Sequence, residues 1–144
     1  AGSARIVAEQ GDSTLAAIAA KAEKETAYHL RHCAEWLIRL GDGTKESHRR
    51  AQAALEKLWP FGGELFAVPD SERALIDMDV IIDPQTLRPQ WDETINVILA
   101  RATLSRPEDG WMQSGGRAGR HSEHLGYLLA ELQYLQRSHP GAQW

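Results

Sequence analysis

The stretch STLAAIAAKAEKETAYHLRHCAEWLIRL, residues 13–40, decides the fold of this 144-residue chain. At roughly 100° per residue its apolar positions fall within one arc, which is typical of a long helix that faces a core. At about 1.5 Å per residue the helix is about 40 Å long, a length found in helical bundles. Asp12 or Ser13 is placed to cap its start, and Gly41 to form a left-handed C-terminal cap. The arc contains Leu15, Ile18, Ala19, Ala22, Thr26, Leu30, Cys33, Trp36, Leu37 and Leu40.

A second helix follows after a short turn. Gly41-Asp42-Gly43 forms the connection, Thr44 caps the new helix, and Pro60 stops it at about Trp59. Because the turn is so short, the two helices must lie antiparallel and adjacent.

For residues 61–84 we predict an irregular segment at the surface, an excursion between two helices of the bundle. We expect short helical turns over 61–66 and 71–78, and a brief extended piece over 80–82. The proline and aspartate residues around these segments are typical of surface connections.

Two more helices complete the chain. One spans about residues 89–103, and the last spans about 120–138, with the glycine-rich loop 105–119 between them. No alternating strand pattern is present, so we predict an all-α helical bundle forming one domain over residues 1–144. Residues 1–12 give little information, although 4–10 look like the tail of a helix that is already running, which suggests a start part-way into a longer protein.

The composition excludes several classes of protein. Hydrophobic residues make up 42% of the chain and charged residues 25%, as in an average soluble domain, and the net charge is −4. This balance argues against a nucleic-acid partner, and no apolar run is long enough to cross a membrane. Cys33 is the only cysteine, and the N-terminus lacks a signal-peptide pattern. We therefore expect a cytoplasmic protein.

Polar residues interrupt two of the apolar stripes. His29, preceded by Glu25, lies in the arc of the first helix, while His121 and His124 lie on the predicted last helix. This distribution is similar to the metal site of a ferritin-like bundle, where two irons need Glu-x-x-His pairs from two helices. No glutamate of this chain has a histidine three residues on. We therefore predict no native metal site, and expect these four residues to form a buried polar network.

Two alternative uses of these residues remain. His29, His121 and His124 could bind Zn, Cu or Ni in a self-sufficient metalloenzyme. His29 could also activate Cys33 as a nucleophile, although a lone cysteine on an apolar stripe more often packs in a core. We favour the polar network over both.

The loop over residues 113–120 is glycine-rich, basic and leads into a helix. Its Arg117 and Arg120 are weak candidates for binding a phosphate group, such as that of an acyl-CoA, near a helix N-terminus. The loop lacks the Lys-Ser/Thr ending of a P-loop and follows no strand. We favour the interpretation that its glycines allow close backbone packing.

Aromatic residues that we expect to be exposed are candidates for contacts with another chain, although some of them could simply cover the edges of the core. They are Trp91, Trp111, Tyr127, Tyr134 and Trp144.

Several long runs make the chain similar to a known family, the C subunits of bacterial phenylacetyl-CoA epoxidases. The likeness covers residues 15–66 and 85–144. The runs that carry it are YHLRHCAEWLIRLGDGT (28–44), ESHRR (46–50), LWPF (58–61), ELF (64–66), GWMQSGGRAGRHSEHLGY (110–127) and LQRSHPGAQW (135–144).

This resemblance implies a ferritin-like fold and membership of a multicomponent monooxygenase of aerobic phenylacetate degradation. In such a system a related A subunit carries the diiron centre, and a reductase with FAD and a [2Fe–2S] cluster delivers electrons from NADPH. The product is a ring 1,2-epoxide formed with O₂. The C subunit is regarded as the non-catalytic mate of the A subunit, so the resemblance implies a structural subunit that needs no cofactor of its own.

Two departures from the family pattern matter. Family chains are longer at the N-terminus, so the resemblance implies a ferritin-like bundle truncated at that end. Lys45 stands where an acidic residue is expected before Glu46-Ser47-His48, which leaves His48 without a metal motif. Because a truncated bundle would leave the first helix uncovered, we expect the chain to form a homodimer or a swapped assembly.

Overall fold

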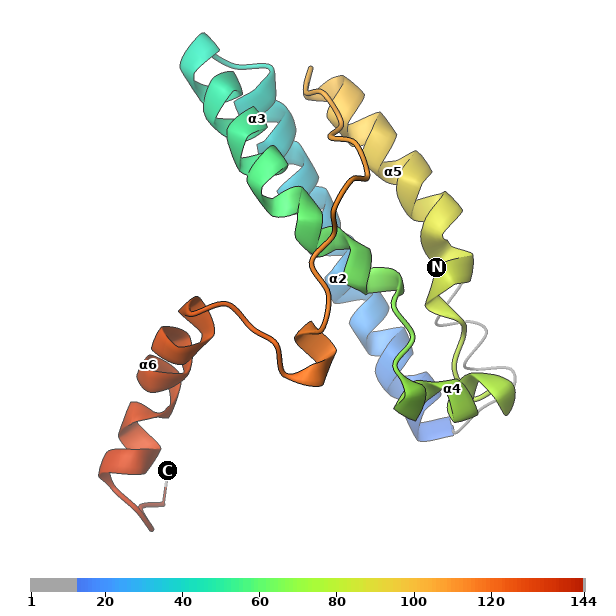
Figure 1. The fold of residues 1–144 in the computed structure, drawn as a ribbon, viewed down its shortest axis with the longest axis vertical. Helices are drawn as coiled ribbons and strands as arrows, with labels where there is room; N and C mark the ends of the chain where they lie inside the picture. The colour runs from blue at the N-terminus through green and yellow to red at the C-terminus, as the bar shows by residue number, and fades with distance from the viewer. Residues whose placement is uncertain (1–12, 144) are drawn as a thin grey trace. The chain divides into compact units, whose positions relative to one another are not determined.

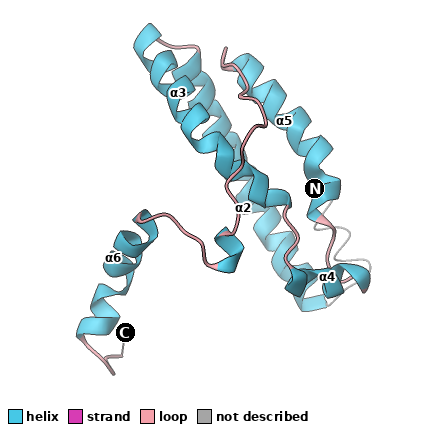
Figure 2. Cartoon of the chain, viewed as in Figure 1, coloured by secondary structure: helices cyan, strands magenta, loops and turns pink. Residues whose placement is uncertain are grey.

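The computed structural model describes residues 13–143. These residues form two compact units, 13–113 and 114–143, which are described separately. Helices and loops make up both units, and no strand occurs among the described residues (Figure 2). The prediction of an all-α chain is confirmed. None of the described helices is long and apolar enough to cross a bilayer.

Helices α2 and α3 form the antiparallel pair predicted from the short turn (Figure 1). Helix α2 spans Ser13–Gly41 and α3 spans Lys45–Leu58. Thr44 caps α3 as predicted, because its side chain accepts a hydrogen bond from the Ser47 amide and the Ser47 side chain accepts one from the Thr44 amide. The cap expected at Asp12 lies outside the described residues.

The excursion after α3 is helical throughout its regular parts. It consists of the 3₁₀-helix η1 (Trp59–Phe66), the short helix α4 (Asp70–Asp77) and the 3₁₀ turn η2 (Pro84–Leu87). The extended piece expected over 80–82 is not a strand. The amides of Val80 and Ile81 instead bond to the Leu75 carbonyl, so this segment folds back onto the end of α4.

Helix α5 (Arg88–Arg101) returns along α2 (Figure 1). The core of this unit lies where α2, α3 and α5 meet, and it is small. Leu99, Ala102 and Leu104 are its buried hydrophobic residues. The partly buried residues around them are Leu37, Ile38, Ala51, Leu55 and Ile95.

Gly41 does not form the left-handed cap that we predicted. It ends α2 in the helix itself and is absent from the residues with positive φ. Because Gly41 has no side chain, the end of α2 can lie close to the backbone of Ala102. A Cβ atom at position 41 would lie 2.2 Å from the Ala102 carbonyl oxygen. The Gly41 carbonyl is satisfied by His48 Nδ1 at 2.8 Å and the Thr103 hydroxyl at 3.2 Å.

The apolar stripe of α2 is mostly uncovered within the described residues, in agreement with the expectation that a truncated bundle leaves the first helix uncovered. Leu37 packs at the core, and so does Ile38, which lies outside the predicted arc. Every residue from Ala20 to Cys33 is exposed, including the cysteine expected in the core. The large exposed side chains of the predicted arc are Leu15, Ile18, Leu30, Trp36 and Leu40.

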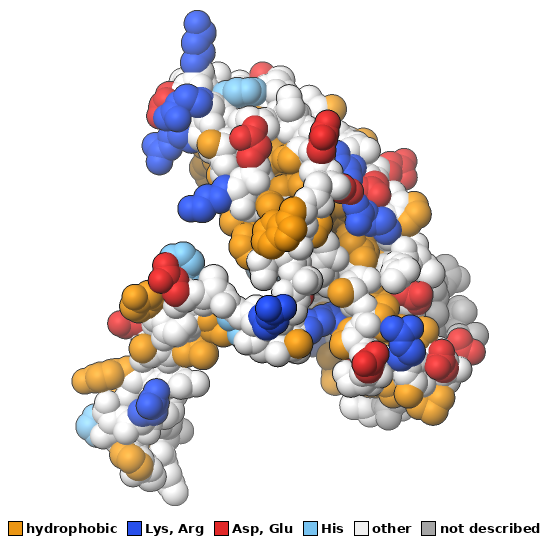
Figure 3. All heavy atoms as spheres, in the orientation of Figure 1, with side chains coloured by type: hydrophobic (Ala, Val, Ile, Leu, Met, Phe, Trp, Pro, Cys, Tyr) orange, Lys and Arg blue, Asp and Glu red, His pale blue; other side chains and the backbone are white. Residues whose placement is uncertain are grey.

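The second unit contains the 3₁₀ turn η3 (Gly116–Ala118) and the helix α6 (His124–Ser138). Helix α6 begins four residues later than predicted. Gly119 has a φ of 85° and residues 120–123 are not helical, so the helix cannot start before the loop has closed. Apart from the half-buried Leu125, the apolar side chains of α6 are exposed (Figure 3).

Candidate functional site

The residues predicted to form a polar cluster lie in both units. Glu25 and His29 are exposed in the middle of α2, while His124 is the first residue of α6. His121 is not on the last helix as predicted, because it precedes the start of α6. It therefore does not share a helix face with His124, as residues three apart on a helix would.

The described residues contain no metal-binding geometry. No group of three or more His, Cys, Asp or Glu side chains within residues 13–143 could hold a metal ion. Since the four cluster residues belong to separate units, their meeting as a polar network stays a prediction.

The predicted phosphate-binding loop has a defined geometry. Gly115 and Gly119 adopt left-handed φ values of 92° and 85° on either side of η3, and the Arg120 amide bonds to the Gly115 carbonyl at 2.8 Å. A Cβ atom at Gly115 would lie 2.6 Å from the Arg120 side chain, so this arginine packs against its own loop. The arrangement explains the glycine at 115 and leaves Arg117 and Arg120 as untested candidates for binding an anion.

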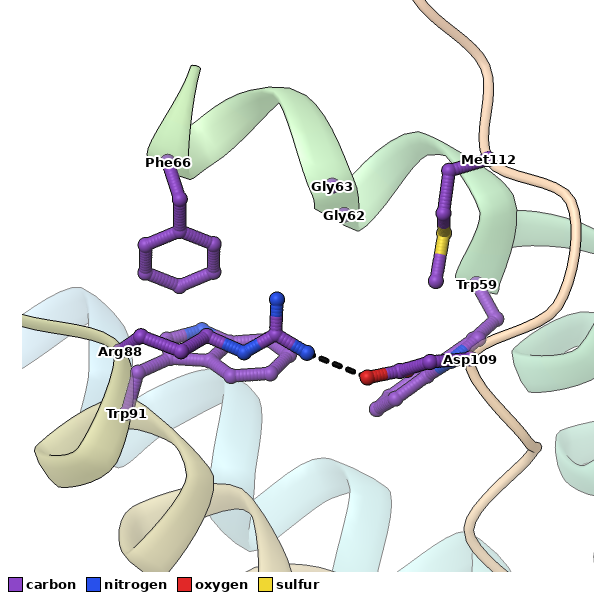
Figure 4. A pocket seen from close by; sticks show the side chains of 8 residues that line it. All are labelled: Trp59, Gly62, Gly63, Phe66, Arg88, Trp91, Asp109 and Met112. Atoms are coloured by element: carbon purple, nitrogen blue, oxygen red, sulfur yellow. Dashed lines mark hydrogen bonds and ion pairs between the residues drawn. The ribbon is translucent and has the colours of Figure 1, made fainter. Parts of the chain in front are cut away.

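The clearest side-chain constellation was not predicted. Arg88 and Arg106 lie among the rings of Trp59, Phe66 and Trp91. In Figure 4 the Arg88 guanidinium lies between Phe66 and Trp91, at 4.9 Å and 5.6 Å from the two ring centroids. Such cation–π contacts stabilise arginine side chains that are partly withdrawn from water. We call these five residues, with Asp92 and Asp109, the arginine–aromatic cluster.

Two aspartates neutralise the arginines of this cluster. Asp92 accepts hydrogen bonds from Arg106 at 2.5 Å and from Arg88 at 3.2 Å. Asp109 pairs with Arg88 and also accepts a hydrogen bond of 3.0 Å from the Trp59 indole N–H. The Arg106 hydrogen bond, helped by Arg88, holds the pKa of Asp92 below its ordinary value.

The cluster fastens the segment after α5 to the rest of its unit. Asp109 and Arg106 belong to this segment, Trp91 and Asp92 belong to α5, and Trp59 begins η1. Trp91, which we expected to be available to another chain, is therefore half-buried inside the cluster. The signal that could have found part of it is the Arg88–Asp92 spacing, which is typical of an ion pair on a helix.

The space inside the cluster is too small for a substrate. It amounts to about 10 Å³, close to the smallest volume that holds one water molecule. A shallower groove of about 350 Å³ lies beside it, lined by Gly63, Phe66, Ala67, Gln85 and Arg88. The residues that line these two spaces include no nucleophile next to a general base.

Comparison with known proteins identifies the family of this chain. A sequence model of the family described as "Phenylacetic acid catabolic protein" matches residues 5–144. This chain belongs to that family. Among curated proteins, it is 47% identical over 136 residues to the C subunit of 1,2-phenylacetyl-CoA epoxidase from Escherichia coli (strain K12).

Membership of the phenylacetic acid catabolic protein family confirms the predicted resemblance and the ferritin-like helical class. The aligned region covers 94% of this chain and 55% of the relative. The chain thus spans about half the length of the curated relative that it matches.

Proposed function

We propose that this chain is a non-catalytic structural subunit of a phenylacetyl-CoA epoxidase, acting in aerobic phenylacetate degradation in the cytoplasm. The observation that carries the proposal is the 47% identity to a protein named as the C subunit of that enzyme. The absence of any Glu-x-x-His sequence supports the non-catalytic part, because an oxygen-activating iron pair needs such motifs.

The partner in this proposal is a diiron catalytic subunit, together with the other subunits of the oxygenase. This chain would stabilise the catalytic subunit, while a reductase containing FAD and an iron–sulfur cluster would supply electrons from NADPH. The exposed apolar side chains of α2 and α6 support an assembling role, since apolar surface of this extent favours association. The same surface supports self-association into a homodimer or swapped assembly.

Co-expression with the catalytic subunit of the epoxidase tests the proposal. We expect the two chains to co-purify, the bound iron to stay with the catalytic subunit when the complex is separated, and this chain alone to show no epoxidation. A metal bound in stoichiometric amount to this chain alone, and lost on His121→Ala, would instead support the metalloenzyme that uses His29, His121 and His124.

The acyl-CoA-binding alternative has its own measurement. Affinity for an acyl-CoA that falls on Arg117→Ala or Arg120→Ala, while complex assembly is unchanged, would move the function from scaffold to binding module. Arg73→Ala is a matched control, because Arg73 is another exposed arginine and belongs to a different helix, α4.

A further inference from the structure

The segment that follows the core residue Leu104 has no regular secondary structure, and we call residues 105–113 the strap. In Figure 1 the strap leaves the end of α5 and runs back between α3 and α5. Within the described residues, the backbone–backbone hydrogen bonds of 105–112 reach no other element, since the single one joins the Gly110 amide to the Glu108 carbonyl. Side chains therefore do most of the work of holding the strap to its unit.

The first two residues of the strap are fastened to α3 and α5. The Gln52 side chain pairs with the backbone of Ser105, donating to its carbonyl at 3.0 Å and accepting from its amide at 2.9 Å. Arg106 donates to Asn96 at 2.8 Å and to Asp92 at 2.5 Å, both on α5. This end of the strap thus bridges the two helices.

The other half of the strap is fastened to η1 and to the start of α5. Asp109 pairs with Arg88 and accepts the Trp59 indole N–H at 3.0 Å. At the end of the strap, the Gln113 amide donates to the Pro60 carbonyl at 2.9 Å. None of the contacts at either end involves α2, so they do not depend on what covers the open side of that helix.

The two sets of contacts share partners. Asp92 accepts hydrogen bonds from both Arg106 and Arg88. The Trp59 ring lies 5.1 Å from the Arg106 guanidinium, while its N–H donates to Asp109. Loss of one contact leaves a charged group of the other set with fewer partners, and hydrogen bonds in such a network depend on one another. The contacts should therefore break together.

The strap also forms one wall of the small space inside the arginine–aromatic cluster. Asp109 and Met112 are the strap residues on that wall (Figure 4). The wider groove of about 350 Å³ shares Gly63, Phe66 and Arg88 with the same space. Movement of the strap away from η1 would join the space to the groove and uncover the rings of the cluster.

We infer that the strap is a lid over this aromatic space, which opens and closes as one unit while the helices beneath it stay folded. Local opening costs least where few apolar groups are buried and the backbone is bonded to few neighbours. No residue of the strap is buried, and the Arg106 and Asp109 side chains are 26% and 41% exposed. In the core of the same unit, Leu99 and Ala102 are 3% and 0% exposed.

Amide hydrogen exchange of the intact chain, followed by NMR, tests whether the two ends move together. The Ser105 and Gln113 amides are both hydrogen-bonded and report on the two ends of the strap, while the buried Ala102 amide reports on the end of α5. We expect the two strap amides to have protection factors within about threefold of each other and at least about tenfold below that of Ala102.

Substitutions at one end of the strap should be felt at the other. Gln52→Ala removes the partner of Ser105, and we expect the protection factor of Gln113 to fall at least about threefold. Asp109→Asn removes a charge from the middle of the strap, and the protection factor of Ser105 should fall by about the same factor. Glu108→Gln is the matched control, because it removes a charge from an exposed residue of the same strap and should leave both values unchanged.

Three results would contradict the inference. An effect confined to the substituted end would mean that the strap consists of two independently fastened parts. Exchange of Ala102 together with the strap amides would mean that the whole unit opens, and so would a loss of Ala102 protection in Gln52→Ala or Asp109→Asn. None of these results bears on the structural-subunit proposal, which co-purification with the catalytic subunit tests separately.

Discussion

The two parts of helix α2 differ more than their sequences suggest. At its C-terminal end, Gly41 is buried against Ala102, and Leu37 and Ile38 pack beside Leu99. In the middle of the same helix every residue is exposed. Both parts carry apolar side chains at helical spacing. The difference teaches that an amphipathic pattern specifies a surface that can be buried, while a neighbouring element decides whether it is buried.

The packed C-terminal end of α2 also depends on more specific contacts than the middle of the helix does. Its carbonyl at Gly41 is satisfied by two side chains from elsewhere in the chain, His48 and Thr103. Thr103 holds a left-handed φ of 57°, which is costly for a β-branched residue. The middle of α2 has no such buried glycine or strained residue. Substitutions there should therefore change the free energy of unfolding little, unless a partner covers this part of the helix.

The largest expected effect is at Gly41. Gly41→Ala places a Cβ atom 2.2 Å from the Ala102 carbonyl oxygen, and backbone on both sides must move. We expect the free energy of unfolding to fall by about 3 kcal/mol or more. Urea denaturation measures the change. Gly62→Ala, where an added Cβ meets nothing within 4 Å, should change it by less than about 0.5 kcal/mol.

A pair of leucines tests the contrast directly. Leu99 is 3% exposed at the core and Leu30 is 50% exposed on α2. Leu99→Ala should cost about 3 kcal/mol, because it removes buried contacts and leaves a cavity. At protein concentrations low enough to keep the chain monomeric, Leu30→Ala should lower the free energy of unfolding by less than about 1 kcal/mol. Equal losses for the two variants, measured by the same urea titration, would show that the middle of α2 is covered in solution.

A smaller effect, of opposite sign, is expected where a residue with left-handed φ follows a helix, because glycine at such a position can raise the free energy of unfolding. Asp79 and Thr103 both have φ near 57°, and each follows a helix whose carbonyls are satisfied in the same way. Asp79→Gly should stabilise the chain by about 1 kcal/mol by relieving strain. Thr103→Gly relieves the same strain but loses the hydrogen bond to Gly41, worth about 1 kcal/mol, so its net effect should be near zero. Thermal unfolding of both variants checks the difference.

The smallest effect concerns the arginine–aromatic cluster at acid pH. Because the pKa of folded Asp92 is depressed, this residue adds stability above its unfolded pKa of about 4, and that contribution is lost as the pH falls through the lower folded value. Asp92→Asn should therefore make the loss of stability below about pH 4 less steep. Urea midpoints measured across this range test it, with the exposed Asp77→Asn as the matched control. The same steepness for wild type and Asp92→Asn would contradict the assignment.

Much of the fold could be predicted because its signals are local. The long helix, the capping box at Thr44 and the stop near Pro60 follow from residues within a few positions of one another. The start of α6 could not be located, because Gly119 adopts its left-handed conformation inside a loop whose closure depends on hydrogen bonds to Gly115. The predicted Gly41 cap was wrong for a related reason, since both a cap and a close contact require glycine.

The candidate site, like the fold, could be predicted from the sequence only in part. The sequence by itself determined the family and the lack of Glu-x-x-His motifs, because identity and spacing are properties of the chain alone. Only the tertiary structure revealed the arginine–aromatic cluster, whose members come from η1, α5 and the segment after α5. Tertiary structure also decided which side of α2 is packed. Helical periodicity states which side chains share a face, but burial depends on contacts between residues such as Gly41 and Ala102, which are far apart in the chain.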